Sequence, residues 1–412
     1  MNICRCAAAL AAVAVIGIPT PAFAAGSPSS SPSRPAALPS GLYGSTDPEY
    51  DGVWRQSLAL LAQHTAGVRP AARAVDWLTG QQCANGAFAA FRAEPARACD
   101  AKVMVDTNST AAAVQALAAL GGHDAATGKA LAWLKSAQNK DGGWGYTPGG
   151  PSDTNSTSVV IGALSAVGEK PATVLKDGKS PYDALLGLAL PCSGDGAGAF
   201  AYQPDKKGEL AANADATAAG VVAALGQGLA ATAGKGTGEA ARCAGSGKPT
   251  AAQAAANGAA YLAHAVAEHG YLTSVLPGAT AQPDYGNTAD AVVALSAQGG
   301  AARARKPLEW LEKHSEAWAR QGGPAAYAQL VLAAHATGTD PRDFGGLDLV
   351  KALDATGPAP QATAAPEAAE DGTPSKSGDN HAVWWAGGAF LLVVIAVGFM
   401  LTRRGNAQGR RP

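Results

Sequence analysis

An internal repeat constrains the fold of this chain more than any other feature of its sequence. Residues 75–88 contain a Trp-Leu-x3-Gln segment followed by a Gly-x-aromatic turn, and residues 131–144 repeat both, 56 positions later. Residues 198–202 repeat the turn after another 56 positions, and weaker copies occur at 261–271 and 310–323. Each copy is one supersecondary unit that buries its apolar face only against neighbouring copies. The chain is therefore expected to fold as an array of similar units.

A second helical stretch follows each of these turns and begins with its own polar residues. Residues 106–110 and 153–157 both read DTNST, and the later copies have Asp215-Ala-Thr217 and Asn287-Thr288 at the corresponding place. Side-chain oxygens of Asp, Asn, Ser and Thr accept hydrogen bonds from the free N–H groups at the start of a helix. We therefore expect these residues to cap helices.

The alternating stretches predict twelve helices in two sets. Helices of the first set are small and apolar nearly all round, which is typical of helices buried on both sides. Helices of the second set carry the charged residues. An apolar inner ring and an amphipathic outer ring predict an all-α fold, an α6/α6 toroid of six helical hairpins. The first set spans about 53–65, 108–121, 155–168, 214–229, 287–299 and 323–337, and the second about 70–81, 126–138, 180–190, 250–266, 304–319 and 345–355.

The N-terminus has the three parts of an export signal. One positive charge lies in Met1–Arg5, an uncharged apolar stretch covers 6–18, and the small residues Ala22 and Ala24 precede the expected cleavage site. The apolar stretch is too short to remain as a membrane anchor. A cleavable signal peptide is therefore predicted over 1–24.

The C-terminal region contains 20 consecutive residues without a charge, 382–401. At about 1.5 Å per residue a helix of this length spans about 30 Å, the thickness of a hydrocarbon core. Trp384 and Trp385 lie at its outer edge, and Arg403 and Arg404 follow its inner end. Positive charge stays on the cytoplasmic side. The sequence predicts a single-pass protein with its N-terminus outside, and the alanine-rich composition favours a bacterial cell surface.

Between these two ends the composition divides the chain further. The Ser/Pro-rich and Pro/Ala/Glu-rich stretches are typical of disordered spacers. The predicted organisation is a signal peptide over 1–24, a disordered spacer over 25–40, the toroid domain over 41–356, a Pro/Ala-rich linker over 357–381, a transmembrane helix over 382–402 and a basic cytoplasmic tail over 403–412.

Four cysteines remain after removal of the signal peptide. An even number outside the cytoplasm indicates two disulfides. Three connectivities are possible, and we favour the pairing of sequence neighbours, Cys83 with Cys99 and Cys192 with Cys243. The net charge of −1 gives no basic surface, which argues against nucleic acid as a partner.

The repeat resembles that of a known family. The Trp-Leu-x3-Gln and Gly-x-aromatic pattern over 133–144 is similar to the QW-type (prenyltransferase/squalene oxidase) repeat of squalene cyclases and of protein prenyltransferase β-subunits. The resemblance covers about 41–356 and is strongest over 70–230. It implies an α/α toroid, the fold that the helix pattern predicts independently. Cobalamin carriers of the transcobalamin kind share this toroid, and the opening Asp153-Thr154 looks like theirs.

The activities of that family need residues that this chain lacks. Cyclases carry their acid in a DxDD motif, which does not occur here, and they add a second α-barrel domain to the toroid. Prenyltransferases hold zinc with Asp, Cys and His, but the mature cysteines are assigned to disulfides. His264 and His269 are five residues apart and do not share a helix face. We therefore expect no metal, no cofactor and neither activity.

Two sets of residues remain as candidates for a site. Four aspartates would gather at one end of the ring, where paired carboxylates could act on a glycan. Aromatic residues near the same rim could stack on a sugar or an isoprenoid. The alternative is a structural role, in which the aspartates cap helices and the aromatics pack the turns against neighbouring repeats. This role is favoured by the presence of these residues once in each hairpin. The aspartates are Asp106, Asp153, Asp215 and Asp284, and the aromatics are Trp54, Trp144, Tyr146, Phe200, Tyr202 and Tyr285.

Two functional hypotheses follow. The favoured one is a surface-displayed module that binds a small apolar or amphipathic ligand, or a partner protein, in the hollow of the toroid. The alternative is an extracytoplasmic enzyme that uses rim carboxylates on an envelope glycan or lipid. The sequence favours binding because it offers no recognisable acid, metal site or nucleophile, and no feature of the repeat array breaks its symmetry.

Overall fold

The computed structural model describes residues 38–236, 242–245, 247–274 and 281–362. The described residues up to Gln361 belong to the first of two units, Met1–Gln361. The predicted signal peptide, transmembrane helix and cytoplasmic tail lie outside the described residues. Within the described ranges, no helix combines the length and the apolar character that crossing a membrane requires.

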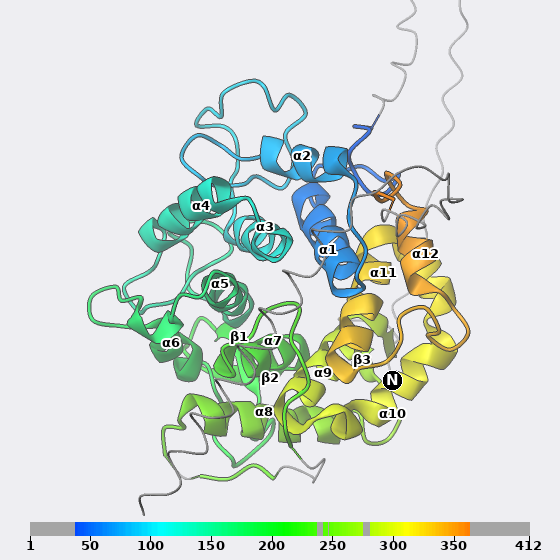
Figure 1. The fold of residues 1–412 in the computed structure, drawn as a ribbon. Coiled ribbons are helices and arrows are strands. Elements are labelled where there is room, and N and C mark those ends of the chain that lie inside the picture. The colour runs from blue at the N-terminus through cyan, green and yellow to red at the C-terminus, as the bar shows by residue number, and fades with distance from the viewer. Residues whose placement is uncertain (1–37, 237–241, 246, 275–280, 363–412) are drawn as a thin grey trace, which may run out of the picture. The chain divides into compact units, whose positions relative to one another are not determined.

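Six helices form an inner ring. They are α1 (Gly52–Thr65), α3 (Thr107–Leu120), α5 (Thr154–Ala166), α7 (Ala214–Ala224), α9 (Tyr285–Gly299) and α11 (Glu316–Thr337). Each packs against the next in this order, and α11 packs against α1, so the ring is closed (Figure 1). Nearly every residue of the middle of these helices is buried, as expected for helices packed on both sides.

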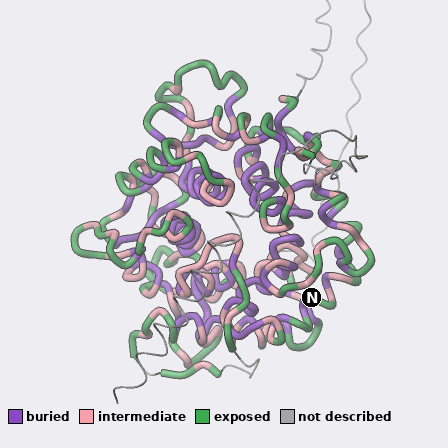
Figure 2. Tube along the Cα trace, viewed as in Figure 1, coloured by how far each residue is buried: buried purple, intermediate pink, exposed green. Residues whose placement is uncertain are grey.

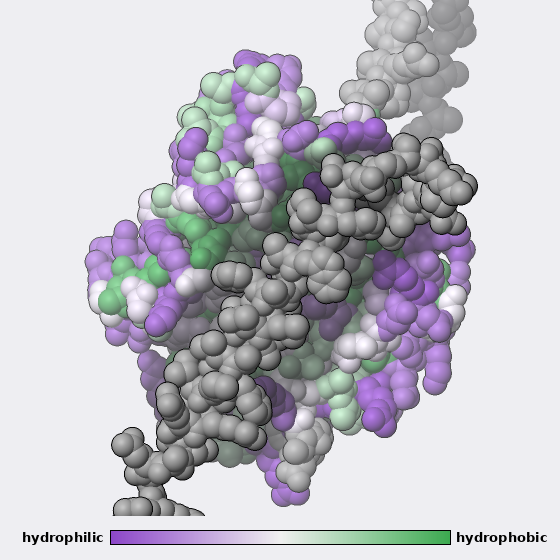
Figure 3. All heavy atoms as spheres, in the orientation of Figure 1, coloured by the Kyte–Doolittle hydropathy of each residue, from purple (hydrophilic) through white to green (hydrophobic). Residues whose placement is uncertain are grey.

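Six further helices surround the inner ring and return the chain to its starting end. They are α2 (Ala72–Gly80), α4 (Asp124–Ser136), α6 (Pro181–Gly187), α8 (Ala251–Ala265), α10 (Ala301–His314) and α12 (Leu349–Asp354). Each packs against the inner helix that precedes it. Buried residues concentrate in the inner ring (Figure 2), and hydrophilic residues gather at the periphery of the face shown in Figure 3. The twelve helices of the described residues confirm a mostly helical toroid.

Helix caps set the start of four inner helices. The Asp106 carboxylate accepts a hydrogen bond from the Ser109 N–H at 2.6 Å and caps α3. Asp153 and Asp284 make the equivalent bonds at the start of α5 and α9. In α7, however, Asn213 accepts from the Ala216 N–H at 2.8 Å. The expectation that Asp215 caps this helix is therefore wrong. A cap at Asp215 would start the helix at residue 216, whereas α7 already begins at Ala214.

A threonine four residues after each cap ties the Gly-x-aromatic turn to its inner helix. The Thr110 hydroxyl accepts from the Phe88 N–H at 2.9 Å, and Thr157 accepts from the Trp144 N–H at 3.1 Å. Thr217 does the same for the Phe200 N–H at 2.9 Å. Thr288 accepts from the N–H of Leu272, which occupies the same place. The repeated aromatic and threonine positions thus have a structural role in each hairpin.

The glutamines of the repeat connect neighbouring hairpins. Gln138 Nε2 donates to the Gly142 carbonyl at 2.8 Å and to the Val174 carbonyl, beyond α5, at 3.3 Å. Gln82 makes the equivalent pair of bonds, the second to Ala126 in α4 at 2.9 Å. Since buried carbonyls require partners, these amides stabilise the stacking of one unit on the next.

Two short β-hairpins, which the all-α expectation did not include, precede α7 and α9. In the first, β1 (Phe200–Pro204) pairs antiparallel with β2 (Leu210–Asn213), and Phe200 faces Asn213. In the second, β3 (Leu272–Ser274) pairs with β4 (Gln282–Asp284). Both hairpins replace a loop between an outer and an inner helix, and they leave the ring unchanged.

The predicted disulfide pairing is confirmed. Cys83–Cys99 closes the loop between α2 and α3, and Cys192–Cys243 joins the segment after α6 to the segment before α8. Each disulfide links two positions in loops between helices.

The two ends of the described domain are joined to each other. The buried Tyr43 hydroxyl donates to Gln63 Oε1 in α1, at 2.9 Å, and contacts the Pro358 carbonyl at 3.3 Å. The Gly44 N–H donates to the Thr356 carbonyl at 2.9 Å. The residues that follow α12 therefore bind the segment that precedes α1, and this contact completes the closure of the ring.

Candidate functional site

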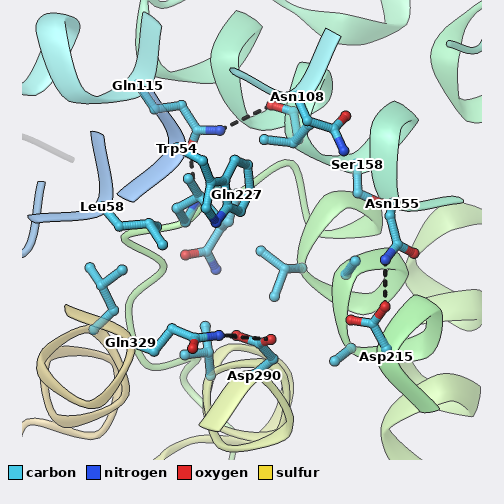
Figure 4. A pocket seen from close by; sticks show the side chains of 18 residues that line it. Trp54, Leu58, Asn108, Gln115, Asn155, Ser158, Asp215, Gln227, Asp290 and Gln329 are labelled. Carbon is cyan, nitrogen blue, oxygen red and sulfur yellow. Dashed lines mark hydrogen bonds between the residues drawn. The ribbon is translucent and has the colours of Figure 1, made fainter. Parts of the chain in front are cut away.

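A cavity of about 220 Å³ lies at the centre of the ring, and all six inner helices contribute to its wall (Figure 4). Part of the wall is apolar, with Trp54 and Leu58 from α1 and Leu332 from α11. The rest carries amides, one hydroxyl and two carboxylates. The polar lining residues are Asn108, Gln115, Asn155, Ser158, Asp215, Gln227, Asp290 and Gln329.

The first carboxylate, Asp215, lies in the first turn of α7. Its Oδ2 accepts a 2.6 Å hydrogen bond from the side-chain amide of Asn155 in α5. Burial raises the pKa of Asp215, and the negative charge of Asp284 raises it further. Counted from the helix caps, Asp215 occupies the position that Asn108 and Asn155 occupy in the two preceding units.

The second carboxylate, Asp290, lies deeper in the ring, six residues after the cap of α9. The corresponding positions after the other caps are Ala112, Val159 and Ala219. Gln329 Nε2, from α11, donates to its two oxygens at 3.5 and 3.4 Å. Burial raises the pKa of Asp290 to about 7, and the charge of Asp215 adds to the shift.

These two carboxylates break the symmetry of the repeat at positions that line the cavity. The expectation that the array contains no such break is wrong. Asp290 was missed by the sequence analysis, although a detectable signal exists: it is one acidic residue within the otherwise apolar run 289–295. An ionisable residue on a helix that is buried on both sides needs a reason to be there, because burying its charge costs free energy.

Several oxygens of the cavity wall have no hydrogen-bond partner among the described residues. Ser158 is only 6% exposed, yet its hydroxyl is unpaired. The side-chain carbonyl oxygens of Asn108 and Asn155 are also buried and unpaired. Buried polar atoms in proteins are nearly always paired. All three oxygens belong to residues that line the cavity.

The segment that follows α7 closes one end of the cavity. Gln227, Gly228 and Leu229 line the cavity beyond the C-terminal end of α7, whereas Asp215 lies in the first turn of that helix. Gln115 holds this segment, because its Oε1 accepts from the Leu229 N–H at 2.8 Å. Its Nε2 donates to the Val159 carbonyl at 3.0 Å.

Glycine is required where this segment meets α5. A Cβ at Gly162 would lie 2.7 Å from the Gly228 Cα and 2.9 Å from Gln115 Nε2. Both distances are shorter than real Cβ atoms show, so a side chain here would displace the segment. The close contact between Gly162 and Gly228 thus fixes one boundary of the cavity.

The cavity has an acidic electrostatic character. Asp215 and Asp290 are its charged lining residues, and the described residues of the lining include no Lys, Arg or His. Within the described part of the chain, no three His, Cys, Asp or Glu side chains are close enough together to hold a metal ion. The site therefore consists of carboxylates, amide and hydroxyl oxygens, and an apolar wall.

Only one of the four candidate aspartates lines this cavity, and it is Asp215. Asp106 and Asp153 are 3% and 0% exposed, and each accepts the capping bond of its helix. Burial raises the pKa of both carboxyls, and the capping bonds oppose this shift. Asp284 caps α9 through the Asn287 N–H at 3.1 Å. These three aspartates therefore have the structural role of helix caps, the alternative to a role in a functional site.

The predicted rim position is wrong for two of the six aromatics, Trp144 and Phe200. Trp54 lines the cavity, but Trp144 and Phe200 are fully buried within the wall of the domain. The Trp144 indole donates to the Leu134 carbonyl at 2.7 Å, and the Phe200 ring packs over Gly220. Both rings fill space between an inner and an outer helix, because the Thr bond to the turn directs them inward.

The remaining three aromatics are outside the cavity lining. Tyr146 and Tyr202 are 46% and 42% exposed. Tyr285 packs against Trp310 and Trp318, with ring centroids 4.9 and 5.6 Å apart. None of the three is among the residues that line the cavity.

Comparison with known proteins gives a similarity of fold. No family model matches the sequence, and no curated protein matches it significantly. A protein from Actinoplanes of known structure is 16% identical over 73% of this chain and 94% of its own, with a TM-score of 0.48. The ent-copalyl diphosphate synthase from Streptomyces platensis is 17% identical over 70% of this chain, with a TM-score of 0.45. This chain spans about half of that synthase, 50%.

Fold and site together define an α/α toroid with an acidic, partly apolar cavity enclosed by its inner helices. At the identities given above, the similarity to the two solved structures concerns the fold alone.

Proposed function

We propose that this protein is a cell-surface, membrane-anchored module that binds a small amphipathic molecule in the cavity of its toroid. The observation that carries the proposal is the combination of an apolar wall with buried oxygens that have no partner among the described residues. Ligand sites typically combine a mostly apolar lining with a few convergent polar groups. A cavity with only a structural role gains nothing from unpaired polar atoms, since each one costs free energy.

The proposed location rests on the sequence and on the disulfides. The signal peptide over 1–24 and the transmembrane helix over 382–402 are predictions about residues outside the described ranges. Two disulfides suit an oxidising compartment outside the cytoplasm. The predicted transmembrane helix near the C-terminus would hold the toroid at the external face of the membrane.

A cavity-filling variant tests the binding proposal. The full-length protein in detergent is screened by thermal shift against amphipathic compounds of about nine non-hydrogen atoms, a size set by the cavity volume. Ala219 lines the cavity, so Ala219→Trp should abolish the shift produced by any compound that binds there. The matched control is Ala302→Trp at an exposed position of α10. Absence of any stabilising compound, or equal binding by both variants, would contradict the proposal.

An enzymatic function is the second candidate, and Asp290 is the observation in its favour. A carboxyl with a pKa of about 7 can donate and accept a proton near neutral pH. Together with Asp215 it would supply acid–base groups for an envelope glycan or lipid. Turnover of such a substrate that disappears in Asp290→Asn, with binding retained, would favour catalysis over binding alone.

A further inference from the structure

We propose that the cavity selects a primary ammonium ion carried on a short apolar group. The proposal, which rests on the binding function above, stands on three features of residues that line one cavity: the carboxylates of Asp215 and Asp290, the unpaired oxygens of the wall, and the Trp54 indole (Figure 4). It adds to the binding function the charge and the shape of the ligand.

The two carboxylates have no positive partner in the part of the chain that the structure describes. Among the described residues, the ion pairs involve other groups, and neither Asp215 nor Asp290 contributes to one. Buried carboxylates are normally paired with a cation or remain protonated. A ligand that brings a positive charge would supply the missing partner.

The buried unpaired atoms of the wall are oxygens, which can accept hydrogen bonds. The Asn155 amide directs its N–H group to Asp215, which leaves its carbonyl oxygen as the unpaired atom. The Asn108 carbonyl oxygen and the buried Ser158 hydroxyl are unpaired as well. A primary ammonium has three N–H donors and no acceptor. These oxygens and the two carboxylates can accept from a primary ammonium, whereas a quaternary ammonium has no N–H to donate.

The apolar wall determines the rest of the ligand. Trp54, Leu58 and Val222 offer an apolar surface, and the face of an indole also attracts cations. A cavity of 150 Å³ holds a benzene ring, so by proportion the 220 Å³ here corresponds to about nine non-hydrogen atoms. Phenethylamine has this size, and 2-phenylethanol is its uncharged counterpart of nearly the same shape.

The charge of the site changes with pH in a defined way. Asp215 from α7 and Asp284 at the start of α9 are the charged groups that act on Asp290, whereas α11 presents the neutral Gln329. With a pKa of about 7, the ionised fraction of Asp290 rises about tenfold from pH 6 to pH 8. Binding of an ammonium ion should strengthen by up to about tenfold over this range. At pH 7 it should release a proton from Asp290.

Calorimetric titration of the full-length protein in detergent tests the inference. Phenethylamine should bind at least about tenfold more tightly than 2-phenylethanol at pH 8, since a charged hydrogen bond contributes about 1.5–3 kcal/mol. At pH 7 the binding heat should depend on the ionisation heat of the buffer, because a proton is released. Asp290→Asn should remove the proton release and reduce the preference, because Asp215 is then the one remaining carboxylate of the lining. Ala219→Trp, which keeps both carboxylates, should abolish binding of both compounds.

The outcomes separate this inference from the binding function. Equal affinity for the amine and the alcohol, abolished by Ala219→Trp, would overturn the cation inference and leave the binding function intact. Binding of neither probe would also overturn it, and the compound screen would then decide the binding function. Amine binding that Ala219→Trp leaves unchanged would place the amine outside the cavity and overturn the inference. Melting curves of each variant confirm that the compared proteins are folded.

Discussion

The side-chain amide of Asn155 in α5 donates a 2.6 Å hydrogen bond to the carboxylate of Asp215 in α7, and so links two neighbouring inner helices at the cavity wall. In the two preceding units an asparagine occupies the position of Asp215. The contact therefore joins Asn155, which follows the repeat pattern, to Asp215, which departs from that pattern in the next unit.

Substitutions at the start of α7 should separate the roles of its two polar residues. Asn213→Ala removes the helix cap and should lower the free energy of unfolding by about 1 kcal/mol. Asp215→Asn removes no cap and relieves a carboxyl whose pKa is raised by burial, so its stability at pH 7 should equal or exceed that of the wild type. Thermal unfolding measures both. Greater destabilisation by Asp215→Asn than by Asn213→Ala would show that Asp215, and not Asn213, caps the helix.

Asp290 should make the folded domain less stable as the pH rises. Its pKa is about 7 in the folded state and 3.8 ordinarily, so between these values the folded state holds a proton that the unfolded chain has lost. Stability contributed by the protonated carboxyl is therefore present at pH 4 and lost by about pH 7. At about 1.4 kcal/mol per pKa unit, the loss should be on the order of 2–4 kcal/mol.

Comparison of the wild type with Asp290→Asn isolates this contribution. The neutral amide does not titrate, so the stability difference in favour of the variant should grow from pH 4 to pH 7 and then remain constant. Denaturant unfolding at a series of pH values gives the difference directly. A constant difference across the range would show that Asp290 ionises normally.

Two glycine substitutions should have opposite effects. Gly162→Ala places a methyl group 2.7 Å from the Gly228 Cα and should destabilise the domain by about 1–3 kcal/mol through overpacking. Gly128→Ala is the matched control, because it lies in α4 with no atom within 4 Å of the added Cβ. Alanine is the better helix former, so this variant should gain up to about 1 kcal/mol. Similar melting temperatures for the two variants would contradict the close contact.

The two disulfides should contribute unequally to stability. Their half-cystines are 16 and 51 residues apart. Chain-entropy arguments then give about 3 kcal/mol for Cys83–Cys99 and about 4 kcal/mol for Cys192–Cys243. Double serine variants of each pair, unfolded in denaturant, measure these contributions. A larger loss for the shorter loop would indicate that local packing, rather than loop closure, dominates.

The toroid could be predicted from the sequence because local and global signals agree. Polar openings, apolar inner stretches and the repeated glutamines each follow from the geometry of one hairpin, and the structure uses them accordingly. The boundaries of α11 differed because two helical segments join across a kink at Gly323, where φ is +66°. The β-hairpins were missed because their strands are short, three to five residues, and show no clear alternation.

The cavity could be predicted only in outline. A pattern shared by every unit identifies what the hairpin needs, and it led to Asp106 and Trp144, which are structural. The lining residue Asp290 departs from the pattern, so its role depends on which helix faces the ring interior and on what lies opposite. Gln329, its partner from α11, is distant in sequence, and nothing local connects the two.

The contact between Tyr43 and Pro358 has a consequence for the topology of the chain. Because the segment before α1 and the segment after α12 meet through direct hydrogen bonds, a short peptide could join them covalently. New ends could then be opened in the exposed turn at 205–208, between β1 and β2. Such a circularly permuted protein would keep every inner helix in its place. The order of the hairpins along the chain is thus separable from their order around the ring.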